Sequence, residues 1–153
     1  MNAPRLPWNT LAPVQYKSLA AVSMASAKSS LGPVLVELVQ TRVSQINGCA
    51  YCLDMHVRDL RKAGESWKRL NVLSAWREVP NLFTAKEQAA LAWAESLTNL
   101  RAGFDDRNAE FEALRAHFTE QEIVELSWTV AAINAWNRMA IGMHQPVDDT
   151  PIE

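Results

Sequence analysis

The helical spacing of the apolar residues is the feature that most restricts the fold of this chain. Between Pro33 and Ile46 the apolar side chains recur three and four residues apart, which places them in one broad stripe along a helix. Two Thr-x-x-Glu sequences, at 84–87 and 119–122, are capping boxes that begin further helices. No segment has the sustained alternation of apolar and polar residues that a half-buried strand requires. The sequence therefore predicts an all-α fold, a bundle of about six to eight helices.

Prolines, glycines and capping residues divide this pattern into elements. Pro13 suits the first turn of a helix, and the pair Asn47-Gly48 breaks a helix directly before Cys49. Gly64 supplies a C-terminal cap. We expect helices over 13–29, 33–46 and 49–63, a short helix from Ser66 that ends before Pro80, one from 84 to about 97, one that Asp105 or Asp106 caps and that runs to Phe118, and a long one over 123–143.

One domain accounts for the whole length. A chain of 153 residues hides roughly 68 to 70 % of its unfolded surface, so a disulfide framework is not needed for stability. We expect a single domain over residues 1–153, with an extended N-terminal arm at 1–12 anchored by Trp8 and a flexible polar tail at 145–153. The helix around 131–141 is apolar on most sides, which indicates burial in the bundle or at a subunit interface.

Charge and the N-terminal sequence restrict the partners and the compartment. The formal net charge is -2 and basic residues alternate with acidic ones, so we expect neither nucleic acid nor an anionic membrane as a partner. The chain has no signal-peptide pattern and no run of about 20 apolar residues. We therefore expect a cytoplasmic protein, in which a Cys-x-x-Cys pair is catalytic or metal-binding rather than a permanent cross-link.

Reactive side chains concentrate between Glu37 and His56. Cys49, Cys52 and His56 lie three and four residues apart, so on a helix they project toward one face. Glu37 can reach that face from the preceding helix. A helix N-terminus and a nearby imidazolium both lower the pKa of a thiol. The set therefore contains a nucleophile, a second thiol with which it can form a disulfide, and a base.

Other uses of these residues compete with redox chemistry. A structural zinc ion could take all four side chains, although such sites more often use four Cys or His ligands. A c-type haem requires His directly after the second cysteine, where this chain has Leu53, and a thioredoxin-type motif requires a βαβ unit. In the remaining alternative, the cysteines are inert buried residues and His56 is an ordinary core histidine.

The pattern Glu37-x11-Cys49-x2-Cys52-x3-His56 resembles the signature of the AhpD-like alkylhydroperoxidases, within the carboxymuconolactone decarboxylase superfamily. The flanking sequence Ile-x-Gly-Cys-Ala-Tyr-Cys-Leu-Asp-Met-His and the sequence Asn-Ala-Trp-Asn-Arg at 134–138 are also similar to that family. The resemblance covers about residues 15–145. It implies helical subunits that assemble into homo-oligomers, often trimers or hexamers, with the cysteine site near a subunit interface and with no cofactor or metal.

The resemblance also implies a role for each residue of the motif. Cys52 would attack a small hydroperoxide and become a sulfenic acid, and Cys49 would resolve it to a disulfide. His56, oriented by Glu37, would remove the Cys52 proton. A dithiol would reduce the disulfide, and in the best-known members a lipoyl-bearing protein supplies it. The predicted function is thus thiol-dependent hydroperoxide reduction; the alternatives are a redox-sensing or partner-binding oligomer, or a disulfide reductase with little peroxidase activity.

Two features stand apart from this motif. Some members of the family have a second histidine directly before the second cysteine, whereas this chain has Tyr51, which removes one possible hydrogen-bond donor. Asn134, Asn137 and Arg138 interrupt an otherwise apolar helix. They could line the site, or they could tie helices together through buried hydrogen bonds.

Overall fold

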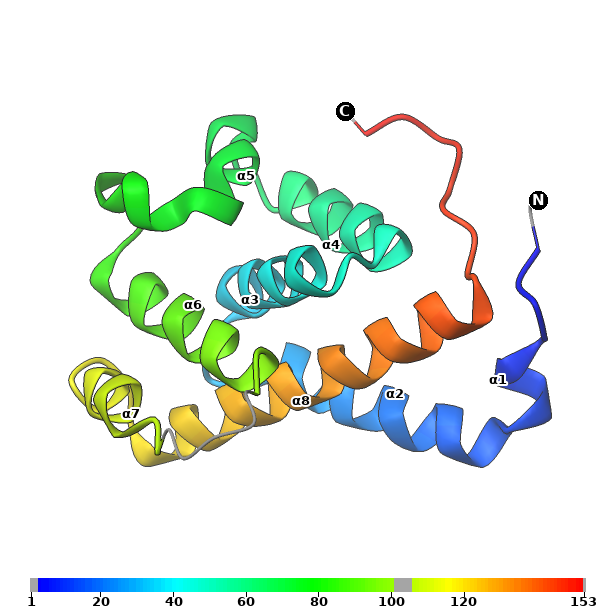
Figure 1. Cartoon of the computed structure of the whole chain (residues 1–153), viewed down its shortest axis with the longest axis horizontal. Helices are drawn as coiled ribbons and strands as arrows, with labels where there is room; N and C mark the ends of the chain where they lie inside the picture. The colour runs from blue at the N-terminus through cyan, green and yellow to red at the C-terminus, as the bar shows by residue number, and fades with distance from the viewer. Residues whose placement is uncertain (1–2, 101–105, 153) are drawn as a thin grey trace.

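The computed structural model describes residues 3–100 and 106–152, and within these ranges every regular element is helical (Figure 1). The all-α prediction is therefore confirmed. No helix in the described ranges is long and apolar enough to cross a membrane. The elements are α1 (Trp8–Leu11), α2 (Pro13–Ala27), α3 (Pro33–Asn47), α4 (Ala50–Lys62), α5 (Trp67–Val72), the 3₁₀-helices η1 (Leu73–Glu78) and η2 (Pro80–Leu82), α6 (Ala85–Thr98), α7 (Asn108–Arg115) and α8 (Glu120–Met143).

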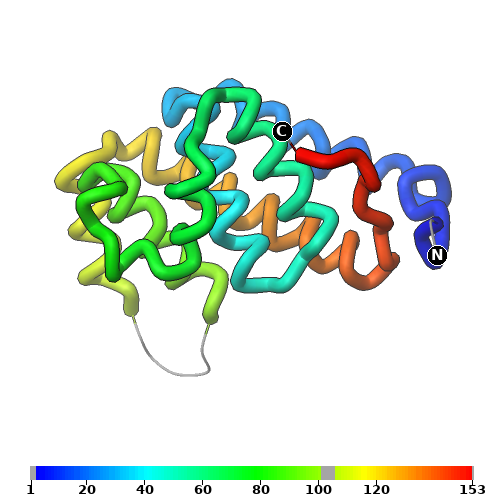
Figure 2. The backbone as a smooth tube through the Cα atoms, turned by 90° about the horizontal axis from the view of Figure 1, so that it is seen from above, coloured from blue at the N-terminus to red at the C-terminus, as the bar shows by residue number. Residues whose placement is uncertain are grey.

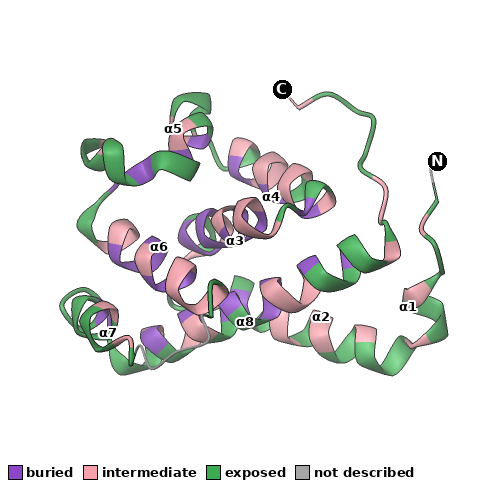
Figure 3. Ribbon diagram, viewed as in Figure 1, coloured by how far each residue is buried: buried purple, intermediate pink, exposed green. Residues whose placement is uncertain are grey.

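Helix α3 is the centre of the bundle and packs against α4, α6 and α8 (Figure 1). Its buried residues are drawn in purple in Figure 3. Val39 and Val43 belong to a core cluster shared with α6 and α8. Leu38 belongs to a second cluster, with Leu60 of α4 and Leu73 of η1. Because apolar contacts surround α3, the residues along it hold fixed positions relative to the neighbouring helices.

Both capping boxes begin helices as predicted. The Thr84 hydroxyl accepts the backbone N–H of Glu87, whose carboxylate accepts the backbone N–H of Thr84 at 2.7 Å. Thr119 and Glu122 make the same reciprocal pair at the start of α8. These bonds satisfy backbone donors that would otherwise lack partners in the first turn.

The prediction of a single short helix between Ser66 and Pro80 is wrong. Ser66 does cap α5, since its hydroxyl accepts the backbone N–H of Arg69, but α5 ends at Val72 and the chain continues as η1. Leu73 and Trp76 of η1 are both buried. The backbone is non-helical at Ala75, with φ -119° and ψ 28°, so the chain kinks between these two buried side chains instead of continuing α5.

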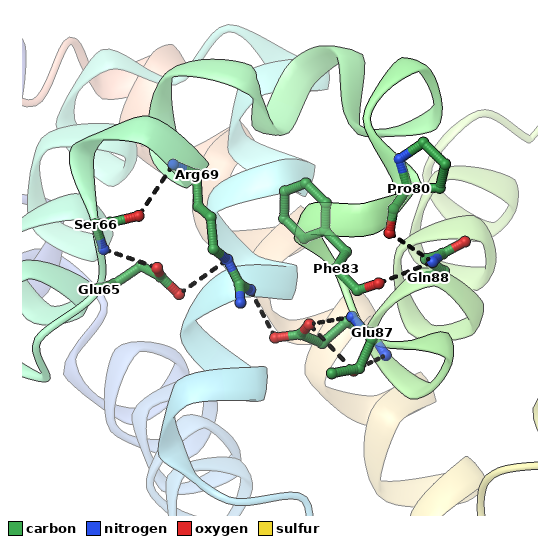
Figure 4. A network of polar contacts seen from close by, with 8 residues as sticks. Glu65, Ser66, Arg69, Pro80, Phe83, Glu87 and Gln88 are labelled. Atoms are coloured by element: carbon green, nitrogen blue, oxygen red, sulfur yellow. Dashed lines mark hydrogen bonds and ion pairs between the residues drawn. The ribbon is translucent and has the colours of Figure 1, made fainter.

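A polar network holds the segment from α5 to η2 against α6 (Figure 4). Arg69 donates to Glu87 at 2.7 Å and lies 3.4 Å from a carboxylate oxygen of Glu65. The Gln88 amide donates to the carbonyl oxygens of Pro80 and Phe83. The Gln88 side chain of α6 thus satisfies backbone carbonyls at the end of this segment.

Glu95 of α6 joins three elements. Its carboxylate accepts from Arg42 of α3 at 2.6 Å, from the Trp76 indole of η1 at 3.0 Å, and from Arg77. Burial acts to raise the pKa of Glu95, but the hydrogen bonds from Arg77, Arg42 and Trp76 outweigh it and lower that pKa below the ordinary value of 4.5. The carboxylate is therefore held ionised in the folded protein.

The helix expected to end at Phe118 is shorter than predicted. Of its two candidate caps, Asp105 lies outside the described residues, and Asp106 accepts the backbone N–H of Asn108 at 3.0 Å. Arg107 occupies the cap position itself, with φ 56°. Helix α7 ends at Arg115, because the chain must turn before Phe118 enters the core ahead of α8.

Both ends of the chain contact the bundle. The extended conformation expected for the arm is wrong at Trp8–Leu11, which form the short helix α1. Trp8 anchors the arm as predicted, with its ring 5.2 Å from that of Tyr16 and 5.7 Å from that of Trp136. Figure 2 shows the last residues passing beside α4. There Arg58 donates to the carbonyl oxygens of Thr150 and Pro151. The flexibility of the tail stays a prediction.

Candidate active site

The junction of α3 and α4 is set by one residue with positive φ. Gly48 has φ 69° and ψ 34°, a left-handed conformation that glycine adopts at little cost. The carbonyls of Ser44 and Gln45 accept the backbone N–H groups of Cys49 and Gly48 at 3.1 and 3.3 Å. The predicted break at Asn47-Gly48 is therefore confirmed. It ends α3 so that α4 packs back along it.

The two cysteines stand at the start of α4 and form a disulfide. Their Cα atoms are 5.4 Å apart, within the range that a disulfide requires. Cys49 is the N-cap residue, and its sulfur accepts the backbone N–H of Cys52 at 3.3 Å. Both residues are buried in the chain. The structure therefore brings the pair together in its oxidised form.

Glu37 and His56 meet across the two helices. The distance from Glu37 Oε2 to His56 Nδ1 is 2.7 Å, and His56 is only 4 % exposed. A carboxylate only accepts, so this bond fixes the Nδ1–H tautomer when the ring is neutral and leaves Nε2 with its lone pair. Nε2 is buried and has no hydrogen-bond partner among the described residues. The expected reach of Glu37 to the cysteine-bearing helix is confirmed.

A pocket of about 550 Å³ opens beside these side chains. Of the two cysteines Cys52 lines it, together with Glu37 and His56. The other side chains of its wall are largely aromatic or apolar, with a few amides and a carboxylate. They include Trp8, Tyr16, Gln40, Tyr51, Trp136 and Gln145. The volume falls within the range of small-molecule sites, roughly 300 to 1,000 Å³.

The sequence did not reveal several of these pocket residues. Gln40 follows Glu37 by three residues, so a polar side chain on the buried stripe of α3 was the one available signal. Tyr51 stood out only as a departure from the family pattern, yet its ring lines the pocket. Trp8 and Trp136 come from opposite ends of the chain. Only the packing of α1, α2 and α8 brings their rings to the pocket.

The two asparagines of α8 tie helices together. Asn47 Nδ2 donates to Oδ1 of Asn134 at 3.0 Å and of Asn137 at 2.8 Å. The amide of the fully buried Asn137 donates to the Ser44 hydroxyl at 3.0 Å. Arg138 donates to Asn134 from the surface. The helix-tying interpretation is thus confirmed for Asn134 and Asn137 but not for Arg138, whose printed bonds stay within α8. The asparagine bonds fix the end of α3 next to the Gly48 break.

No three His, Cys, Asp or Glu side chains within 3–100 and 106–152 are placed to share a metal ion. The sulfurs that zinc would need are bonded to each other. The Glu37 carboxylate is bonded to the imidazole that would be its fellow ligand. This arrangement fits a redox pair beside a base better than the zinc alternative.

The sequence also matches a known family model. The matched region runs from residue 13 to residue 96, just over half of the chain, and includes Glu37, Cys49, Cys52 and His56. The chain belongs to the carboxymuconolactone decarboxylase family. The predicted AhpD-like character is confirmed by the family match and by a solved relative. The region ends before α7 and begins after α1, so this member of the family carries its N-terminal arm outside the matched part.

Similar proteins cover almost the whole chain. The uncharacterized protein YdfG of Bacillus subtilis (strain 168) is 35 % identical over 139 residues, 91 % of this chain and 93 % of YdfG. A crystal structure from Agrobacterium tumefaciens, of a protein of unknown function proposed as the antioxidant defence protein AhpD, is 36 % identical with a TM-score of 0.89, covering 96 % of this chain and 99 % of that one.

A more distant similarity shows the fold alone. A variant of the debrominase Bmp8, solved in complex with 2,3,4-tribromopyrrole, is 15 % identical with a TM-score of 0.75 over 92 % of this chain and 74 % of that one. Enzymes therefore occur on this fold. The reaction of the present family member has to be argued from its own site.

Proposed function

We propose that this protein is a thiol-dependent hydroperoxide reductase that cycles Cys49 and Cys52 between dithiol and disulfide. The observation that carries the proposal is the shared position of Cys52 and His56 in one pocket, with His56 Nδ1 bound to Glu37. The Nε2 lone pair is then available to take a proton beside the pocket. An antioxidant role fits the family and the cysteine pair.

The reaction follows from these positions. In the reduced protein His56 takes the Cys52 proton, and the thiolate attacks the outer oxygen of ROOH. A sulfur–oxygen bond forms, the oxygen–oxygen bond breaks, and the leaving RO⁻ takes the proton from His56 as ROH. Cys49 then loses its thiol proton and its sulfur attacks the Cys52 sulfenic acid; the sulfur–oxygen bond breaks, the hydroxide takes up that proton and leaves as water, and the disulfide forms. That disulfide is the state present in the structure.

A dithiol of a second molecule closes the cycle. Its thiolate attacks the disulfide, and its second thiol releases the protein as Cys49 and Cys52 thiols while the reductant becomes a disulfide. The backbone N–H that Cys49 Sγ accepts would favour the Cys49 thiolate as the leaving group. A lipoyl-bearing protein is the reductant we propose first. Such turnover also requires a reducing compartment, for which we propose the cytoplasm.

We also propose that the chain acts as a homo-oligomer, a trimer or hexamer. Helix α8 exposes Val124 and Trp128, and α2 exposes Val14 and Met24. Several large apolar side chains left exposed on two neighbouring helices favour a subunit interface. Light scattering of the purified protein tests this: a mass of 17.1 kDa at working concentration would contradict it.

Steady-state turnover tests the main proposal. The pre-reduced protein should consume cumene hydroperoxide in the presence of dihydrolipoamide, and Cys52→Ser should abolish consumption. Normal turnover in Cys52→Ser would refute the mechanism. Reversible formation of the disulfide without turnover, measured by thiol titration, would instead support the redox-sensing alternative, which the Cys49–Cys52 disulfide by itself also allows.

A further inference from the structure

The N-terminal arm forms part of the wall of the pocket that the motif also lines. Pro4, Pro7, Trp8 and Asn9 line the pocket although they precede the part of the chain that the family model matches. The arm is held in place at its base, since the backbone N–H and the guanidinium of Arg5 donate to the carbonyls of Met143 and Gly142 at 2.7 and 2.9 Å. This wall is thus part of the folded molecule.

Aromatic rings make up the face of that wall. The rings of Trp8, Tyr16 and Trp136 pack edge to face, with centroids 5.2 to 5.7 Å apart. The Trp8 indole N–H donates to Gln145, and the Trp136 indole N–H donates to Ser23. Because protein atoms satisfy both indole donors, what these rings offer a ligand is mainly apolar surface.

Two polar side chains that line the pocket have atoms without a hydrogen-bond partner among the described residues. Gln40 is 6 % exposed, lines the pocket one helical turn after Glu37, and its side-chain amide makes no hydrogen bond to any residue that the structure describes. The buried Nε2 of His56 is likewise unpartnered. Because the Gln40 amide makes no bond to the protein and lines the pocket, it is available to bond to a ligand there.

We propose that the arm determines the substrate specificity of this site: Trp8 packs against the apolar organic group of a hydroperoxide, while the Gln40 amide binds its oxygen end beside His56 and Cys52. This inference rests on the proposed function and assigns two residues beyond the motif. A phenyl or branched alkyl group suits the ring wall, whereas hydrogen peroxide has no group to place there. Trp8 therefore favours organic hydroperoxides over hydrogen peroxide, whereas Gln40 binds the oxygen end of both.

Oxidation rates of the reduced protein by two peroxides test the assignment. Trp8→Ala should lower the second-order rate constant with cumene hydroperoxide about tenfold, because roughly 60 Å² of lost apolar contact corresponds to that factor. The rate constant with hydrogen peroxide should stay within twofold. Trp67→Ala removes a half-exposed tryptophan outside the pocket lining and should change neither. Equal falls for both peroxides, or no fall with cumene hydroperoxide, would overturn the role of Trp8.

Replacing Gln40 should change the two rate constants in a different pattern from replacing Trp8. Gln40→Leu keeps the size of the side chain and removes its donor, so both rate constants should fall by a similar factor, about tenfold, which is the loss of one hydrogen bond to a developing charge. Gln121→Leu makes the same change on the surface of α8 and should have no effect. A selective loss with only one peroxide, or no loss, would contradict the assignment of Gln40.

Direct binding separates this inference from the proposed function. Isothermal titration of the oxidised protein with 2-phenyl-2-propanol, the alcohol product, needs no turnover. Wild-type protein should bind it, Trp8→Ala about tenfold more weakly, and Trp8→Phe, which keeps a ring, within about threefold of wild type. Binding that follows this order without peroxidase turnover would refute the proposed function alone. Peroxidase turnover, together with equal affinity of all three proteins for the alcohol, would refute the role of Trp8 and leave the proposed function standing.

Discussion

The Glu37–His56 bond sets the expected effect of replacing Glu37. The two side chains meet at 2.7 Å and are largely buried, with 22 % and 5 % of their surfaces exposed, so solvent screens the bond little. A hydrogen bond to an ionised partner is worth roughly 1.5 to 3 kcal/mol, about twice a neutral one. Glu37→Gln keeps an acceptor and should lose about half of this, roughly 0.8 to 1.5 kcal/mol, or about 4- to 13-fold in rate.

Glu37→Leu removes the acceptor altogether. The whole bond is lost, and the imidazole is free to place its proton on Nε2, so the loss should reach about 10- to 150-fold. The assay is the rate of thiol oxidation of the reduced protein by cumene hydroperoxide, stopped with an alkylating reagent. Glu112→Gln, an exposed change on α7, is the matched control. Rates within twofold of wild type in both Glu37 variants would refute the orientation of His56 by Glu37.

Three further outcomes follow from the contacts described above. Cys49→Ser should still react once with a hydroperoxide but accumulate a Cys52 sulfenic acid that a dimedone probe labels; absence of the label would contradict the order of the two thiols. Glu95 has a lowered pKa, so it stabilises the fold above about pH 4.5 and this contribution is lost as the pH falls through the lower folded-state value. The melting temperature of Glu95→Gln should therefore fall less between pH 6 and pH 3.5 than that of wild type, and equal falls would contradict the network. Asn137→Ala leaves polar atoms of Asn47 and Ser44 unpaired and should cost about 2 to 4 kcal/mol in urea denaturation, whereas a cost below 1 kcal/mol would show that these bonds are dispensable.

Local rules account for most of the helix boundaries. The capping boxes at Thr84 and Thr119 and the break at Gly48 each depend on a few neighbouring residues, so the sequence states them directly. Prediction failed at η1, where the burial of Leu73 and Trp76 against α3 decides the geometry. These contacts join residues far apart in the chain, and the spacing of apolar residues within one segment does not predict them.

The motif could also be predicted from residues close together in the chain, except for the contact between Glu37 and His56. Cys49, Cys52 and His56 share one helix, so their common face follows from the helical repeat. The approach of Glu37 follows only from α4 packing back along α3, and the sequence could offer it as an expectation at most.

The sequence by itself determined the helical content, the start of α4 at the cysteines and the family. The tertiary structure decided what surrounds them: a wall that joins Trp8 of the arm to Trp136 of α8, and a partnerless amide at Gln40. The physical reason is how far apart in the chain the interacting residues lie. Helix caps and repeats are set within a few residues, whereas a pocket exists only where separate helices are held apart by the packing of the whole bundle.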